Sequence, residues 1–126
     1  MVLKVSMLKM RADKVIVTVK KVKGHCRAGH KVGDKIVFIG DNIIESDSFC
    51  PLGIAAIFPI LRTMATSGNL PPSSPFYVDK NTWIGCCPDP NNSVVYEMKR
   101  VGVYERRPDT KGKFVPVEET KLGQTK

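Results

Sequence analysis

Four residues that can bind metal ions or act as nucleophiles occur near glycine or proline in this 126-residue sequence: Cys26, His30, Cys50 and Cys87. The first two fall in the glycine-punctuated stretch GHCRAGHKVGD, and each of the other two directly precedes a proline. Three thiolates and one imidazole complete the tetrahedral shell that zinc prefers. The same donors suit ferrous iron or an iron–sulfur cluster. The four residues therefore predict a metal site, with zinc as the first choice and iron as the alternative.

The loop pair Cys26 and His30 has the C-x₃-H spacing found in some zinc sites, but the pair alone is a weak signal. His30 or the neighbouring His25 would otherwise hydrogen-bond to loop carbonyl groups. Asp34 ends the same stretch, and we expect its carboxylate to cap a turn or to orient His30 from behind.

Cys50 is the candidate nucleophile, because Cys50-Pro51 reads as the start of a helix. Unpaired N–H groups and the helix dipole stabilise an anion there, which favours the thiolate form. The structural alternative is that Ser48 caps the helix and Cys50 only packs. Asp89 is the second catalytic candidate, as a general acid or base, but a role in capping its own proline-bounded turn is the alternative.

The neighbours Cys86 and Cys87 should point to opposite faces of a strand. We expect Cys87 to face the site and Cys86 to pack in the core; a strained vicinal disulfide is a further option. No P-loop, Rossmann glycine fingerprint, G-x-S-x-G or H-E-x-x-H motif accompanies these residues.

The elements that must position the site follow from periodicity. Alternating β-branched residues predict a strand from Lys14 to Lys23, and further strands are expected at 35–39, 42–45, 78–84 and 93–103. The apolar stretch from Pro51 predicts one buried helix, kinked or broken near Phe58 by Pro59 and ending at Gly68-Asn69. The expected fold is α+β: a small, mainly antiparallel sheet or open barrel with one helix.

A single domain is expected over residues 14–105, with a basic extension at 1–13 and a flexible tail at 106–126. The sequence shows no secretory signal and no membrane span, and its four cysteines have no disulfide pattern. These features predict a cytoplasmic protein. The apolar helix could also supply a homodimer contact.

The net charge of +8 lies in the two ends of the sequence. Residues 1–23 hold seven Lys/Arg and one Asp, and residues 99–126 hold eight Lys/Arg and four Asp/Glu, whereas residues 24–98 hold five Lys/Arg and seven Asp/Glu. Solvated ends are the favoured interpretation. Binding of RNA or an acidic partner by the ends is the alternative, although the scattered aromatic residues predict no stacking platform.

Three motifs carry a resemblance: Gly29–Asp34 (GHKVGD), Cys50-Pro51, and Cys87–Pro90 (CPDP) followed by Val94–Arg100. Together they resemble a family of small, largely uncharacterised cysteine-containing proteins found mostly in anaerobic bacteria and archaea. The resemblance covers about Lys14 to Val101. It implies that Cys26, His30, Cys50 and Cys87 are the family's cysteine and histidine positions, and it implies no particular activity. The predicted function is a metal- or thiol-centred enzyme or accessory factor in redox or sulfur metabolism, acting on a small molecule or partner protein that the motifs do not identify.

Overall fold

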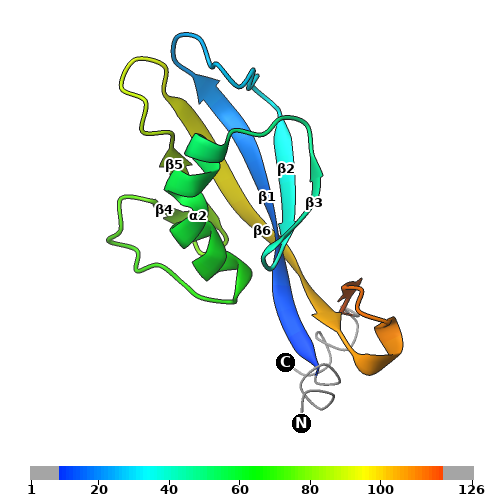
Figure 1. Cartoon of the computed structure of the whole chain (residues 1–126). Coiled ribbons are helices and arrows are strands. Elements are labelled where there is room, and N and C mark those ends of the chain that lie inside the picture. Colours follow the sequence, from blue (N-terminus) through cyan, green and yellow to red (C-terminus); the bar gives the residue numbers. More distant parts are fainter. Residues whose placement is uncertain (1–8, 118–126) are drawn as a thin grey trace.

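The computed structural model describes residues 9–117, which form one antiparallel sheet and one α-helix. The strands are β1 (Met10–Val22), β2 (Lys35–Ile39), β3 (Asn42–Ser46), β4 (Tyr77–Asp79), β5 (Thr82–Cys86), β6 (Val94–Arg106) and β7 (Val115–Pro116). Their order in the sheet is β3-β2-β1-β6-β5-β4, and β7 pairs with the end of β6. The helix α2 (Pro51–Ala65) lies across one face of the sheet (Figure 1). The predicted α+β class with a mainly antiparallel sheet is confirmed. No helix within residues 9–117 is long and apolar enough to cross a membrane.

The core lies between α2 and the sheet. Val15, Val17 and Val19 alternate along β1 and point toward the helix, as their two-residue period predicts. The helix returns a stripe of residues spaced three or four apart: Ile54, Ile57, Leu61 and Met64, all buried. Trp83, Tyr96 and Met98 from β5 and β6 complete the packing. Burial of this stripe fixes which end of the sheet the first turn of α2 occupies.

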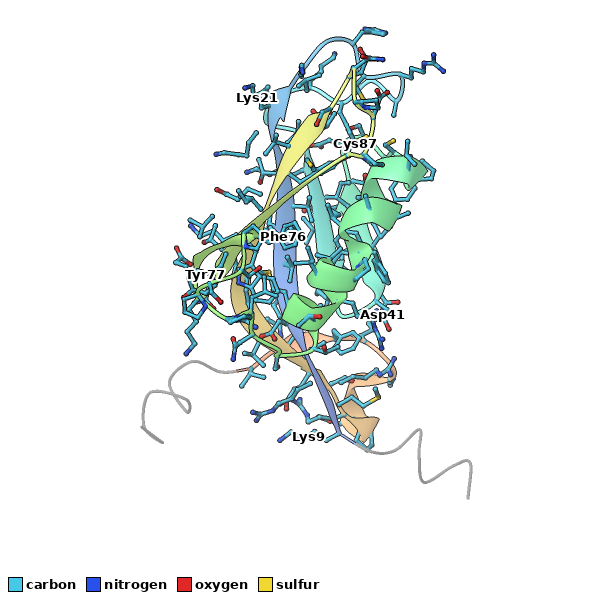
Figure 2. The ribbon with its side chains drawn as sticks, turned by 90° about the vertical axis from the view of Figure 1, so that its left-hand side faces the viewer. Lys9, Lys21, Asp41, Phe76, Tyr77 and Cys87 are labelled. Atoms are coloured by element: carbon cyan, nitrogen blue, oxygen red, sulfur yellow. The ribbon has the colours of Figure 1, made fainter. Side chains whose placement is uncertain are left out.

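The long strands β1 and β6 form a ribbon that runs the length of the molecule (Figure 1). Each has 13 residues, and the pairing runs from Met10 opposite Arg106 to Val22 opposite Val94. The ribbon therefore separates two ends. At one end lie the β1–β2 and β5–β6 loops and the start of α2; we call this the loop end. At the other, β7 folds back beside β6; we call this the ribbon end. Figure 2 labels Cys87 toward the loop end and Lys9 at the ribbon end.

The helix is not broken at Pro59, and its C-terminus differs from the prediction. It runs unbroken through Pro59, because the proline costs one hydrogen bond to the carbonyl of Ala55, and Ala55 lies on the exposed side where water can replace it. The helix ends at Ala65 rather than at Gly68-Asn69, with Thr66 as C-cap. The segment after the helix is instead held by an arginine from β6.

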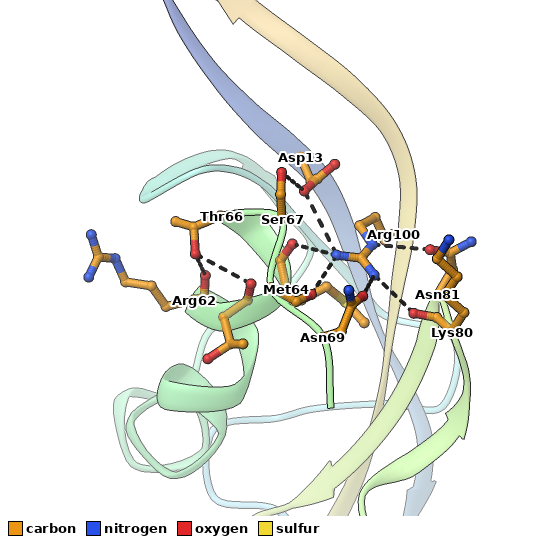
Figure 3. A network of polar contacts seen from close by, with 11 residues as sticks. Asp13, Arg62, Met64, Thr66, Ser67, Asn69, Lys80, Asn81 and Arg100 are labelled. Carbon is orange, nitrogen blue, oxygen red and sulfur yellow. Dashed lines mark hydrogen bonds and ion pairs between the residues drawn. The ribbon is translucent and has the colours of Figure 1, made fainter. Parts of the chain in front are cut away.

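Arg100 of β6 ties three elements together at the C-terminal end of α2 (Figure 3). Its guanidinium donates to the carbonyls of Met64, Gly68 and Lys80 at 3.3, 2.8 and 2.9 Å, and to the side-chain oxygens of Asn69 and Asn81 at 3.0 and 3.1 Å. The buried carboxylate of Asp13, which accepts a hydrogen bond from Ser67, lies 3.9 Å away. This network fixes the helix end to β1 and to the β4–β5 turn.

The structured part of the chain extends beyond the predicted domain of 14–105 on both sides. β1 begins at Met10 because Ala12 and Asp13 are buried and pair with β6. The predicted tail contains a 3₁₀ turn, η1 (Pro108–Thr110), and β7, held by pairing of Val115 with Glu105. The strand predicted at 78–84 is two strands, β4 and β5, joined by a tight turn. The remaining parts of both predicted extensions, 1–8 and 118–126, lie outside the described residues.

Candidate metal and thiol site

Two loops meet at the loop end and are joined by hydrogen bonds. The backbone N–H of Lys23 donates to the carbonyl of Ser93 at 2.8 Å, and that of His25 donates to the side chain of Asn92 at 2.9 Å. Gly24 makes this close approach feasible: its φ is +76°, and a Cβ there would lie 2.4 Å from the Asn92 Oδ1 atom. The β1–β2 loop is thereby held against the β5–β6 loop.

The thiols of Cys26, Cys50 and Cys87 line one cavity of about 150 Å³ between these loops and the start of α2. The rest of its lining is Arg27, Ala28, Leu52, Asp89 and Asn92. Each cysteine comes from a different segment: a tight turn closed by a hydrogen bond from the Gly29 N–H to the Cys26 carbonyl, the N-cap of α2, and the residue after β5. The fold thus places the three predicted thiols at one cavity.

Cys50 is the N-cap residue of α2, as the Cys50-Pro51 pair predicts. Its sulfur accepts a hydrogen bond from the backbone N–H of Gly53 at 3.5 Å. Ser48, the alternative cap, bonds elsewhere. The sulfur therefore lies where the first turn presents unpaired donors, which favours negative charge on it.

Cys86 and Cys87 point to opposite sides, as expected, but only one of the two expected positions is correct. Cys87 is buried at the cavity, and its N–H is held by the carbonyl of Val94 at 2.8 Å. Cys86 is exposed rather than packed in the core. The reason is the alternation along β5: Trp83, Gly85 and Cys87 take the inward positions, so Cys86 faces outward. Both thiols are free.

His30 does not line the cavity; it is buried beside it, with its ring edge-on to the ring of Tyr96 at 5.5 Å between centroids. Its Nδ1 atom contacts the hydroxyl of Ser48, and that hydroxyl donates to the carboxylate of Asp34 at 2.7 Å. Because the Ser48 proton is used on Asp34, Nδ1 must carry the proton that Ser48 accepts. Nε2 then keeps its lone pair, and it has no hydrogen-bond partner among the described residues. Burial lowers the pKa of His30 while Asp34 opposes that shift, so the ring is neutral at pH 7.

Asp34 performs both predicted roles, but it reaches His30 only through Ser48. It also accepts a hydrogen bond from the N–H of Lys31 at 3.0 Å, which closes the turn before β2. The Ser48 and Lys31 hydrogen bonds lower the pKa of Asp34.

Tyr96 is a site residue that the sequence interpretation missed. Its hydroxyl is fully buried beside the three thiols, and it has no hydrogen-bond partner among residues 9–117. Burial raises the pKa of Tyr96 well above its ordinary value, and the nearby Cys50, Cys87 and Cys26 raise it further. The phenol therefore stays protonated and can only be a neutral hydrogen-bond donor or acceptor. The available signal was position: Tyr96 continues the inward alternation of Val94 and Met98 directly after the Cys-Pro-Asp-Pro turn.

Asp89 lies at the cavity wall, but its carboxylate is occupied. One oxygen accepts hydrogen bonds from the N–H groups of Asn91 and Asn92 at 2.9 and 3.0 Å. These bonds lower the pKa of Asp89, so it is ionised at pH 7 and unsuited to act as a general acid. The geometry favours the turn-capping alternative over the catalytic one.

No three His, Cys, Asp or Glu side chains within residues 9–117 are arranged closely enough to hold a metal ion as they stand. Comparisons with known proteins found no matching family model, curated protein or solved structure. The site consists of three cysteines at one cavity and two buried polar atoms, the Tyr96 hydroxyl oxygen and His30 Nε2, that have no hydrogen-bond partner among residues 9–117.

Proposed function

We propose that the protein binds a thiophilic metal ion, zinc in the first place, through Cys26, Cys50 and Cys87. The observation that carries the proposal is that cysteines from three separate segments line one small cavity. Thiolates select zinc or iron over hard cations such as magnesium. Zinc–sulfur bonds are short, about 2.3 Å, so the cysteine-bearing loops would draw inward around the ion.

His30 is proposed as the fourth ligand. Its contact with Ser48 leaves the Nε2 lone pair free, which is the form of imidazole that binds metals. A buried nitrogen without a partner is costly, and a metal ion would remove that cost. The Tyr96 hydroxyl, which has no hydrogen-bond partner among residues 9–117, would gain one by donating to one of the thiolate sulfurs.

The proposed role is in redox or sulfur metabolism, as a small enzyme or an accessory factor. With all four ligands engaged, the ion is shielded and stabilises the fold; with His30 unengaged, the fourth position is open to a substrate. In the open form His30 is a neutral base beside the ion.

The experiment is metal analysis of full-length protein purified without oxygen, together with its visible spectrum. We expect about one zinc per chain, and Cys26→Ser, Cys50→Ser and Cys87→Ser should each abolish stoichiometric binding. Cys86→Ser is the matched control, because Cys86 is adjacent to Cys87 but exposed, and it should retain the metal. Cobalt substitution should give a sulfur-to-cobalt charge-transfer band that the first three variants lose; an iron-specific spectrum would support the iron alternative.

A thiol nucleophile at Cys50 is the second candidate, favoured by the hydrogen bond from the Gly53 N–H to its sulfur. Metal-free protein whose Cys50 is alkylated much faster than Cys26, Cys86 and Cys87 would contradict the metal proposal and support this one.

A further inference from the structure

The ribbon end concentrates positive charge that the sequence distributes between two distant segments. Residues 9–14 contain three Lys/Arg and one Asp, and residues 105–113 contain four Lys/Arg, one Glu and one Asp, giving a net charge of +4. Antiparallel pairing of β1 with β6 brings these segments together, with Met10 opposite Arg106. These charges are therefore gathered at the ribbon end, as binding of phosphate groups requires, although residues 20–34 at the loop end are also basic, with five Lys/Arg and one Asp.

A groove of about 570 Å³ lies at this end, on the face of the sheet away from α2. Val37 and Ile39 form its apolar floor: they alternate with Ile36 and Phe38, which face the helix core. The face is distinct from the cysteine cavity, with which it shares no residue.

Two aromatic rings that line the groove each lie beside a cation. The ammonium of Lys14 lies 5.6 Å from the centre of the Tyr104 ring, and the guanidinium of Arg106 lies 5.1 Å from the centre of the Phe114 ring. Lys113 is an exposed third cation in the lining, against one acidic residue, Glu45. Tyr104 and Phe114 are ten residues apart in sequence, and no aromatic platform was predicted from them. Pairing of β1 with β6 and the return of the chain to β7 bring both rings to the groove.

We propose that this groove binds single-stranded nucleic acid. Lys14, Arg106 and Lys113 would contact the phosphates, while unpaired bases would pack on Tyr104, Phe114 and the apolar floor. A duplex would offer only its phosphates, because its bases are already stacked on one another. An acidic peptide would match the charge but would leave the aromatic rings and the floor without partners. The proposal is independent of the cysteine site.

The test is fluorescence anisotropy of labelled 12-nucleotide oligo(U) and oligo(dT) with the full chain at several salt concentrations. We expect both to bind more tightly than a duplex of equal length, with an affinity that falls as salt rises. Lys113→Gln lies in an exposed loop, so it should not perturb folding, and it should reduce the slope of log affinity against log salt by about 0.7. Phe114→Leu preserves the charge and should weaken binding roughly tenfold at every salt concentration.

The matched control is Lys99→Gln, which removes the same charge from an exposed position of β6 outside the groove and should leave the slope unchanged. Binding that the control weakens as much as Lys113→Gln, or that polyglutamate abolishes while Phe114→Leu has no effect, would show attraction by charge alone and overturn the proposal. The absence of oligonucleotide binding at about 50 mM salt would also overturn it. Cys50→Ser should leave oligonucleotide binding intact, so the two proposals fail separately.

Discussion

At the residue scale, Ser48 determines which nitrogen of His30 is available. Its hydroxyl accepts a hydrogen bond from His30 Nδ1 and donates one to Asp34. If the ring proton moved from Nδ1 to Nε2, Ser48 would have to donate to Nδ1 and would lose its hydrogen bond to the carboxylate. The serine is neither a ligand nor a nucleophile in this arrangement. It transmits the orienting effect of Asp34, which lies four positions from the histidine in sequence and reaches it through the Ser48 hydroxyl.

Removing this hydroxyl tests the arrangement. In Ser48→Ala, His30 can rotate or change tautomer, and we expect the affinity for zinc to fall about tenfold while the fold is retained. Competition between the protein and a chromogenic chelator measures the affinity. Ser73→Ala, in an exposed loop, is the control and should bind zinc normally. An unchanged affinity in Ser48→Ala would exclude His30 from the metal shell.

The close packing of Gly53 against Tyr96 is a second feature at the residue scale. A Cβ on Gly53 would lie 2.0 Å from the Tyr96 hydroxyl oxygen, so only glycine fits the first turn of α2 at this depth. We expect Gly53→Ala to lower the free energy of unfolding by about 1–3 kcal/mol through overpacking. The double variant Gly53→Ala/Tyr96→Phe should recover part of that loss, because it removes the clashing oxygen. Urea unfolding of the four members of the cycle measures the coupling; simple additivity would contradict the contact.

At the element scale, the C-terminal end of α2 depends on one side chain of β6. Arg100 satisfies helix and loop carbonyls and faces the buried Asp13, so Arg100→Met would leave several polar groups unpaired. We expect a loss of about 3 kcal/mol in the free energy of unfolding. Arg62→Met removes an exposed ion pair with Asp41 on the same helix and should cost under about 1 kcal/mol. Similar losses in the two variants would mean that Arg100 does not hold the helix end.

The elements themselves were largely predictable, because the signals that specify them are local. Alternating valines mark β1, and Cys50-Pro51 marks the start of α2 correctly. The helix end was predicted three residues too late, since the carbonyls there bind Arg100, which is more than 30 residues away in sequence. The outward position of Cys86 follows from the alternation along β5, in which Trp83, Gly85 and Cys87 face inward. It was mispredicted because the site and the core lie on the same face of the sheet, so that Cys87 belongs to both.

The cysteine positions of the site were predictable and its polar surroundings were not. Each cysteine lies beside a local turn or helix signal, and three of the four proposed ligands line one cavity. Ser48 and Tyr96 have no distinguishing motif; they join the site through tertiary contacts with His30. Whether the chain belongs to the resembling family, and whether it binds metal, stay predictions.

At the scale of the whole molecule, charges at the ribbon end link stability to pH. Burial alone would raise the pKa of Glu105, but hydrogen bonds and charges from Arg107 and Lys9 more than offset it and hold the pKa below its ordinary value of 4.5. A carboxylate with a depressed pKa stabilises the fold above the ordinary value, and this stabilisation is lost as the pH falls through the folded-state pKa.

Glu105→Gln should therefore make the free energy of unfolding less dependent on pH below 4.5, and it should lower the free energy of unfolding at pH 7. Chemical unfolding at pH 7, 5, 4 and 3 measures both effects. Glu45→Gln, which removes an exposed carboxylate without an ion pair in the part of the chain described, should leave the profile as in the parent protein. An identical profile for Glu105→Gln and the parent would contradict the assignment.

The 13-residue ribbon of β1 and β6 also sets the distance between the two ends of the molecule. From Lys14 to Val22 it spans roughly 25 Å at about 3.3 Å per residue, several Debye lengths at physiological ionic strength. A charged ligand bound at one end of the ribbon is thus screened from the other end. A ligand bound at either end of the ribbon would leave the other end free to bind a different ligand, and the protein would hold the two ligands at a fixed separation.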